Sequence, residues 1–193
     1  ANPAYVGLPN GLSDVDALTY NGGPQGQSRI SRLYFEDAVN PSGLQVAKGV
    51  IMTYAELQFL LAEAAEKGLI SGSAATYYQN GIKGSFDFFR TELPADYLTR
   101  EGVALTGTQA EKLEKIGVQK WISLFYQGLE AWFDWRRTGF PKISPSATNQ
   151  NDNRIPVRFI YPIIEQSLNE ANRAEAVSRM GGDDINSKMW YLK

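Results

Sequence analysis

The best candidate for a catalytic pair in this sequence is a pair of carboxylates that stand four residues apart. Glu130 and Asp134 would lie on one face of a predicted helix, and paired carboxylates are the acid and base of glycosidases. Arg136, Arg137 and Lys142 follow closely and supply compensating charge, so the pattern favours a structural ion-pair network. Because no opposing carboxylate is found on another predicted element, we expect the protein not to be an enzyme.

The chain has no histidine and no cysteine among its 193 residues. Ser-His-Asp and Cys-His catalysis, disulfides and sites with thiolate or imidazole ligands are therefore excluded within this sequence. Asp183, Asp184 and Asn186 follow two glycines and offer oxygens to a calcium ion, but they lack the spacing of a binding loop. They are typical of a turn that ends a helix, and we predict no metal site and no cofactor.

Aromatic residues are abundant, with 4 Trp, 10 Tyr and 9 Phe. Trp121, Phe125, Trp132 and Trp135 follow helical spacing, which predicts packing in the core. In loops the core explanation is weaker, and a ring there can stack on a sugar. The candidate ligand-binding residues are accordingly Tyr5, Tyr20, Asn21, Tyr34 and Tyr97.

The charge balance argues against two classes of partner. With 19 Lys and Arg against 21 Asp and Glu, the net charge is -2, and no global field attracts nucleic acid. The longest apolar stretch, residues 50–65, contains Glu56 and Glu63, whereas a membrane-spanning helix needs roughly 20 mostly apolar residues. We therefore expect that the protein does not bind nucleic acid and has no membrane-spanning helix.

Four stretches of the sequence show helical periodicity, so we expect helices to position the candidate ligand-binding residues. Residues 1–49 are loop-rich, residues 50–138 are helical, and residues 139–193 hold a loop, a helix and an apolar tail expected to dock on the body. The helices are predicted at about 51–67, 73–91, 108–138 and 163–180.

The ends and faces of these helices are also marked in the sequence. Thr53 with Glu56 and Thr108 with Glu111 are capping boxes at the first and third helices. The predicted inward-facing residues are Tyr54, Leu57, Leu61 and Ala64 in the first helix, Tyr78, Ile82, Phe86 and Phe89 in the second, and Ile164, Leu168, Ala171 and Val177 in the fourth. The chain is thus predicted to be mainly α, with helix pairs of the helical-repeat kind and long irregular loops.

Three stretches together resemble the SusD/RagB family of nutrient-binding lipoproteins, in particular its SusD-like branch. The first is Met52–Ala64, with Tyr-Ala-Glu at its start and Ala-Glu-Ala at its end. The second is Gln119–Gly139, which ends in Trp-Phe-Asp-Trp-Arg-Arg-Thr-Gly. The third is Ile155–Pro162, followed by Glu165 and Asn169, with Trp190 near the end of the chain.

The resemblance implies a fold of tetratricopeptide-like helix pairs and a binding function without catalysis. It implies a surface-exposed outer-membrane lipoprotein, held by an N-terminal lipid that this chain does not contain, with a SusC-like TonB-dependent transporter as partner. The ligand would be a nutrient, in our expectation a glycan or oligosaccharide. The matched motif residues Glu130, Asp134, Arg136 and Arg158 have the chemistry of structural ion pairs and transfer no ligand site.

Family members are about two to three times as long as this chain, so the resemblance implies that residues 1–193 are the C-terminal portion of one SusD-like domain. The rival hypothesis from another class is a helical-repeat scaffold that binds only protein. A scaffold would retain a protein partner without any small ligand and would have no concave aromatic pocket.

Overall fold

The computed structural model describes residues 6–9, 12–28, 49–146 and 149–190, and all regular elements in these ranges are helical. The chain divides into two compact units, Ile30–Lys142 and Ala1–Arg29 with Ile143–Lys193. The predicted mainly α class with long irregular connections is confirmed. The α-helices are α1 (Asp14–Thr19), α2 (Tyr54–Glu66), α3 (Ala74–Phe88), α4 (Gln109–Ser123), α5 (Glu130–Thr138), α6 (Ile164–Leu168) and α7 (Glu170–Met180).

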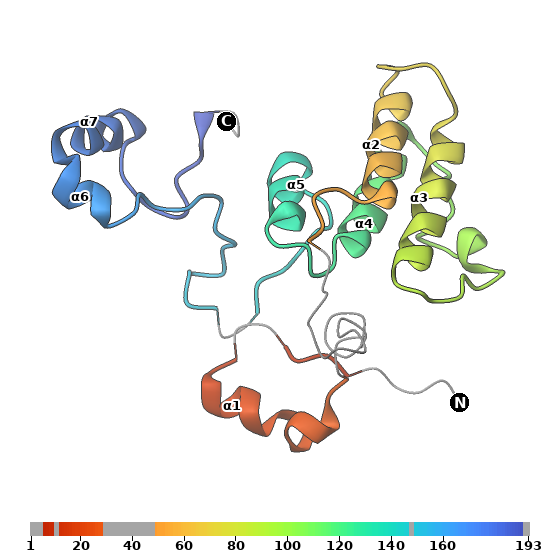
Figure 1. The fold of residues 1–193 in the computed structure, drawn as a ribbon, viewed down its shortest axis with the longest axis horizontal. Coiled ribbons are helices and arrows are strands. Elements are labelled where there is room, and N and C mark those ends of the chain that lie inside the picture. The colour runs from red at the N-terminus through yellow and green to blue at the C-terminus, as the bar shows by residue number, and fades with distance from the viewer. Residues whose placement is uncertain (1–5, 10–11, 29–48, 147–148, 191–193) are drawn as a thin grey trace, which may run out of the picture. The chain divides into compact units, whose positions relative to one another are not determined.

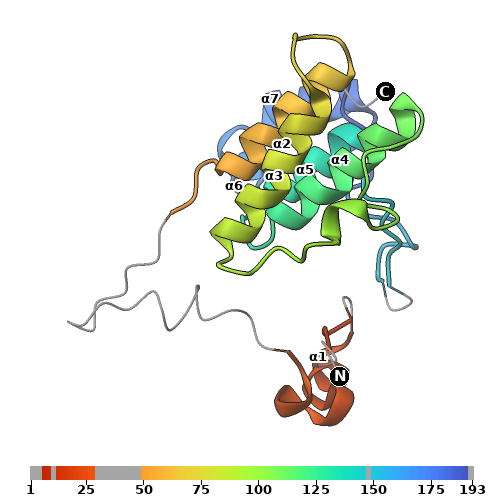
Figure 2. The same ribbon diagram turned by 90° about the vertical axis from the view of Figure 1, so that its right-hand side faces the viewer.

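Helices α2, α3, α4 and α5 make up the larger unit and lie side by side (Figures 1 and 2). Its core is formed where α2 and α3 pair, by the fully buried side chains of Phe59, Tyr78 and Ile82, with Ile116 of α4. Gly81 makes the pairing close, because a Cβ at this position would lie 2.8 Å from the Phe59 ring. Tyr78 is anchored as well as buried, since its hydroxyl donates to the Val103 carbonyl at 2.7 Å.

Both predicted caps mark the starts of their helices, one of them completely. At α4 the Thr108 side chain accepts from the Glu111 amide while the Glu111 carboxylate accepts from the Thr108 amide, so the capping box is confirmed. At α2, Thr53 accepts from the Glu56 amide at 3.0 Å. The Glu56 carboxylate is buried, and burial raises its pKa against the opposing pull of the Lys120 charge.

The long helix predicted over 108–138 is wrong, because the chain turns between α4 and α5. Tyr126 has φ +63° and Gly128 has φ +62°, and such left-handed residues end an α-helix. The turn has a structural consequence. In one continuous helix, residues 14 apart would be separated by about 21 Å along the axis, whereas Lys120 Nζ and Asp134 Oδ1 are 2.8 Å apart.

The ion pair of Lys120 with Asp134 is the centre of a network that confirms the structural interpretation of Asp134. Arg137 donates to Asp134 at 2.8 Å and to both carboxylate oxygens of Glu63 at 2.7 and 2.6 Å. Lys67 adds a bond to Glu63 at 2.5 Å. Together these bonds tie α2, α4 and α5 to one another, and the bonds from Arg137 and Lys67 hold the pKa of Glu63 at about 2.

Two predictions about buried faces are wrong. On α2 the buried residues are Ala55, Phe59 and Ala62, while Tyr54 and Leu57 of the predicted inward stripe are 59 % and 43 % exposed. Trp121 on α4 and Phe125 just after it, both predicted in the core, are 41 % and 53 % exposed. The periodicity was real in both helices, but α2 is apolar on more than one side and spacing alone does not select the face that packs.

The smaller unit contains short helices. The predicted helix at 163–180 is divided into α6 and α7 at Asn169, and its predicted inward residues Ile164 and Leu168 are exposed. A buried ion pair fixes the chain nearby, because Arg158 donates to Asp183 at 3.0 Å and Arg173 donates to the same carboxylate at 2.9 Å. Trp190 is exposed and residues 191–193 lie outside the described ranges, so docking of the tail stays a prediction.

No helix in the described part of the chain is long and apolar enough to cross a membrane.

Candidate functional site

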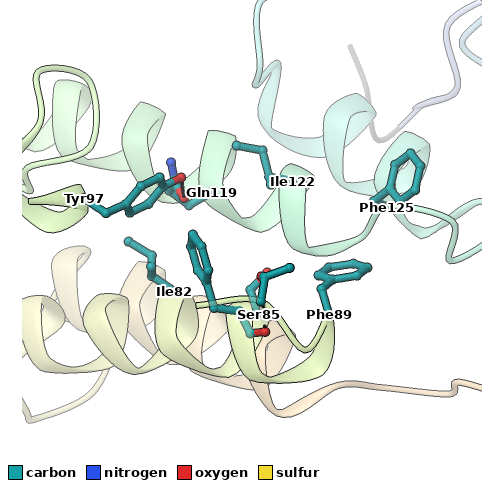
Figure 3. A pocket seen from close by; sticks show the side chains of 9 residues that line it. Ile82, Ser85, Phe89, Tyr97, Gln119, Ile122 and Phe125 are labelled. Carbon is teal, nitrogen blue, oxygen red and sulfur yellow. Dashed lines mark hydrogen bonds between the residues drawn. The ribbon is translucent and has the colours of Figure 1, made fainter. Parts of the chain in front are cut away.

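An open cleft of about 290 Å³ lies between α3 and α4 (Figure 3). The irregular segment that joins the two helices supplies Tyr97 from a 3₁₀ turn, Tyr97–Thr99. None of the residues around the cleft is charged, and most of the lining is apolar or aromatic. These residues are Ile82, Ser85, Phe86, Phe89, Thr91, Tyr97, Gln119, Ile122 and Phe125.

Tyr97 is held at one end of the cleft by contacts on both sides. Its hydroxyl donates to Gln119 Oε1 at 3.1 Å, which joins the loop to α4. Its ring packs edge-to-face on Phe86, with the ring centroids 5.1 Å apart, and Arg100 lies over the ring at 5.4 Å. A tyrosine fixed in this way presents a defined surface to a ligand at little further entropic loss.

Two aromatic rings meet at the other end of the cleft, tilted at 60° to each other. Phe89 follows the last turn of α3 and Phe125 follows the last turn of α4, and their ring centroids are 6.4 Å apart (Figure 3). The backbone turns sharply after each ring, because Arg90 and Tyr126 both have positive φ. Phe125 is 53 % exposed, so much of its surface is available for contact with a ligand.

Two polar side chains that line the cleft, one from α3 and one from α4, are almost completely buried. Gln119 is 6 % exposed, and with Oε1 accepting from Tyr97 its amide nitrogen remains as a donor. Ser85 is 9 % exposed and lines the same cleft (Figure 3). A neutral ligand with hydroxyl or amide groups would match these side chains, and aromatic rings would cover its apolar faces.

Acid–base catalysis has no support from this lining, because the cleft contains no carboxylate and no lysine. Asp134, half of the candidate carboxylate pair, is buried and bound to Lys120 and Arg137, while Glu130 is exposed on the first turn of α5. The acidic turn after α7 is also structural, since Asp183 accepts from two arginines. Within the described ranges no group of three or more acidic residues could hold a metal ion.

Of the five predicted ligand residues, the structure places one in the cleft. Tyr97 lines it, whereas Tyr20 and Asn21 belong to the other compact unit and stand next to each other in a 3₁₀ turn. Asn21 has φ +49°, and its side-chain amide donates to the Gly26 carbonyl, which gives it a role in closing this turn. Tyr5 and Tyr34 lie outside the described residues, and their role stays a prediction.

Helical spacing predicted that the other aromatic residues of the cleft lie in the core. Phe86 and Phe89 lie on the predicted apolar face of α3, and Phe125 follows the helical spacing of α4. For Phe89 a signal was present in the sequence, because the predicted helix ends at about residue 91, whereas the helix predicted over 108–138 continued past Phe125. Aromatic residues at helix ends contact the connecting segments and solvent as well as the core.

The chain matches one family model over residues 3–162, that of the SusD-like proteins described as starch-binding and associating with the outer membrane. No curated protein matches it. Among solved structures, a SusD homologue from Bacteroides fragilis is 36 % identical with a TM-score of 0.66, and the match covers 75 % of this chain and 35 % of that one. A Bacteroidetes SusD-like protein is 32 % identical with a TM-score of 0.69, with coverage of 75 % and 30 %.

A chitin-binding SusD homologue from Flavobacterium johnsoniae is 31 % identical with a TM-score of 0.64, and the match covers 72 % of this chain and 36 % of that one. The chain thus spans about a third of the length of these solved relatives.

Proposed function

The chain belongs to the SusD-like family, and from this membership we propose that it binds a neutral glycan, without cleaving it, for delivery to a TonB-dependent transporter of the outer membrane. The observation that carries the binding part is the uncharged cleft between α3 and α4, with rings at both ends and two buried polar side chains in its lining. The names of the matched relatives, starch-binding and chitin-binding, support a polymer of glucose or of N-acetylglucosamine as the ligand class.

The cleft suits a sugar on physical grounds. The C–H faces of a pyranose ring are apolar and stack on aromatic rings such as Phe89 and Phe125, while its hydroxyls need hydrogen-bond partners. Gln119 supplies an amide donor and Ser85 a hydroxyl within the same cleft. An acetamido group would use the same amide donor through its carbonyl and would place its methyl group against the apolar wall.

Binding is tested by calorimetry with starch-type and chitin-type oligosaccharides, followed by chromatography of the recovered sugar. We expect binding to at least one class and intact sugar afterwards. Phe89→Ala should weaken binding about fivefold, because one aromatic contact contributes roughly 1 kcal/mol. Phe133→Ala is the matched control, since Phe133 is 42 % exposed on α5 and does not line the cleft. Equal affinities of the two variants would contradict the site, and released products would contradict non-catalytic binding.

The transporter and the outer-membrane location are proposals from family membership. A tagged protein, purified from outer membranes in mild detergent, should retain a TonB-dependent transporter. Retention of another protein partner together with no response to any sugar would favour the protein-interaction scaffold instead. The aromatic cleft argues against this rival, because a scaffold that binds only protein is expected to have no concave aromatic pocket.

A further inference from the structure

Glu56 on α2 is a buried acid that does not line the cleft between α3 and α4. The residue is 6 % exposed, and its carboxylate oxygen Oε2 is buried without a hydrogen-bond partner. The cap of the helix does not use this carboxylate, because the Glu56 group that Thr53 binds is the backbone amide. An ionised carboxylate is costly to bury unless its oxygens accept hydrogen bonds or lie against a positive charge.

The charged groups that act on Glu56 come from α4 and α5. Lys120 of α4 attracts the negative charge of Glu56, whereas Glu130 and Asp134 of α5 repel it. Lys120 is already bound to a different acid, because its Nζ lies 2.8 Å from Asp134 Oδ1. Three carboxyl groups thus act around one buried ammonium group.

The other neighbours of Glu56 within the described ranges are engaged elsewhere or face solvent. Helix α3 also packs on α2, but its two charged residues, Lys83 and Asp87, are exposed. On α2 itself the remaining acids are Glu63 and Glu66, and each is bound by basic side chains of its own. The charge of Glu56 is therefore opposed by Lys120 alone.

A proton on Glu56 removes the repulsion in this cluster. The neutral carboxyl adds no negative charge beside Glu130 and Asp134, and it leaves Lys120 fully available to Asp134. It also makes burial of Oε2 less costly, since a neutral acid loses much less hydration than a carboxylate. The bond between Lys120 and Asp134 is the arrangement that a protonated Glu56 favours.

We propose that Glu56 is a proton switch that controls how firmly α5 is held on α2 and α4. With a proton on Glu56, Lys120 binds Asp134 and fixes α5. Without the proton, the buried Glu56 carboxylate competes with Asp134 for Lys120, and the hold on α5 weakens. Arg137 continues to join α5 to Glu63 of α2, so α5 loosens without separating.

Few other groups interfere with this switch above about pH 4.5. The chain has no histidine, which is the side chain that ordinarily titrates between about pH 5 and 8. Bonds from basic side chains hold the pKa of Glu63 at about 2 and lower that of Asp96, and backbone and hydroxyl donors at Thr108 lower the pKa of Glu111. These three acids stay ionised above pH 4.5, so their contributions to stability are constant there.

The sign of the pH effect follows from the direction of the shift. Burial raises the pKa of Glu56 in the folded protein above the ordinary value of 4.5. Stability is therefore complete below about pH 4.5 and is lost as the pH rises through the folded pKa. Between the two pKa values the folding equilibrium constant falls by up to about tenfold for each pH unit.

The test compares Glu56→Gln with the unmutated polypeptide, as its gene encodes it, in urea unfolding from about pH 4.5 to 9. Glutamine has nearly the volume of the neutral acid and cannot ionise. We expect nearly equal stabilities at the acidic end and a growing advantage of the variant as the pH rises. Glu114→Gln is the matched control, because Glu114 is 38 % exposed, and its curve should stay parallel to that of the unmutated polypeptide.

Two further measurements keep Glu56 itself unchanged or follow α5 directly. Glu130→Gln removes one repelling charge and should move the pH dependence to lower pH. Hydrogen exchange, corrected for the intrinsic rate at each pH, should show that α5 amides lose protection relative to α3 amides as the pH rises. In Glu56→Gln this relative protection should stay constant.

Three results would overturn the proposal. Parallel stability curves for Glu56→Gln and the unmutated polypeptide would mean that Glu56 does not titrate in this range. A variant that is less stable at high pH would mean that the ionised carboxylate stabilises the fold. Relative protection of α5 that does not change with pH would mean that Glu56 has no control over this helix.

Discussion

Replacement of Lys120 by methionine should destabilise the protein strongly, because it leaves a buried carboxylate with half of its charge compensation. Lys120 and Asp134 form a 2.8 Å ion pair in which the side chains are 6 % and 8 % exposed. Methionine has nearly the same volume as lysine and leaves no large cavity. The change therefore removes a charge and little packing.

The magnitude follows from what remains around Asp134. Breaking a buried pair on one side costs about 3–5 kcal/mol, but Arg137 still donates to the same oxygen at 2.8 Å. We therefore expect a loss near the lower limit, about 3 kcal/mol in the free energy of unfolding, or roughly 6–12 °C in Tm for a protein of this size. Lys120→Met should also raise the pKa of Glu56 further, since the Lys120 charge opposes the effect of burial on that carboxyl.

The assay is urea unfolding of four variants: Lys120→Met, Asp134→Leu, the double variant of both, and Lys142→Met. Lys142→Met is the matched control, because Lys142 is 77 % exposed and 3.8 Å from Glu114, and it should change stability by less than about 0.5 kcal/mol. The double variant Lys120→Met with Asp134→Leu should lose less than the sum of the single changes, since neither charge is left buried alone. Equal effects of Lys120→Met and Lys142→Met would refute this account of the ion network.

Three further changes test separate parts of the larger unit. Gly81→Ala should lower the free energy of unfolding by about 1–3 kcal/mol, because the new methyl group would lie 2.8 Å from the buried Phe59 ring. This loss is expected even though alanine favours a helix. A stabilised variant in urea unfolding would contradict the close contact of α2 and α3. Glu63 has a pKa of about 2 in the folded protein against an ordinary value of 4.5, so its contribution to stability is present above about pH 4.5 and is lost as the pH falls toward 2. Arg137→Met should remove much of this pH dependence, which acid unfolding curves measure. An unchanged dependence of stability on pH would be evidence against the pairing. Thr108→Ala should lose about 1 kcal/mol through the capping box of α4, measured in the same urea titration, and no loss would mean that the cap contributes nothing.

Helix starts were predictable from the sequence because they depend on local chemistry. Thr53 and Thr108 cap their helices within one residue of the expected positions, since a side-chain oxygen three residues before a free amide meets the same need in any fold. The positions at which helices end were harder to predict. The break between α4 and α5 rests on left-handed residues such as Tyr126, which carries no local sign of such a conformation.

The choice of buried face and the location of the cleft were beyond the sequence for a different reason. Spacing identifies the faces of α2 that are apolar, but only packing against α3 decides that Phe59 is buried and Leu57 is not. The cleft depends on residues distant in sequence, such as Phe89 and Phe125, whose rings meet only after α3 and α4 have paired. Tyr97 was predicted to be a ligand-binding residue because it stands in a loop. The structure shows in addition that its hydroxyl donates a hydrogen bond to Gln119.

Binding of a glycan in the cleft between α3 and α4 can be observed in a crystal structure of the polypeptide with the oligosaccharide that binds best in calorimetry. We expect electron density for a sugar ring against Phe89 or Phe125, with a hydrogen bond to the Gln119 side chain. Density for the same sugar at another place, with this cleft filled only by solvent or by protein, would show that the cleft is not the binding site.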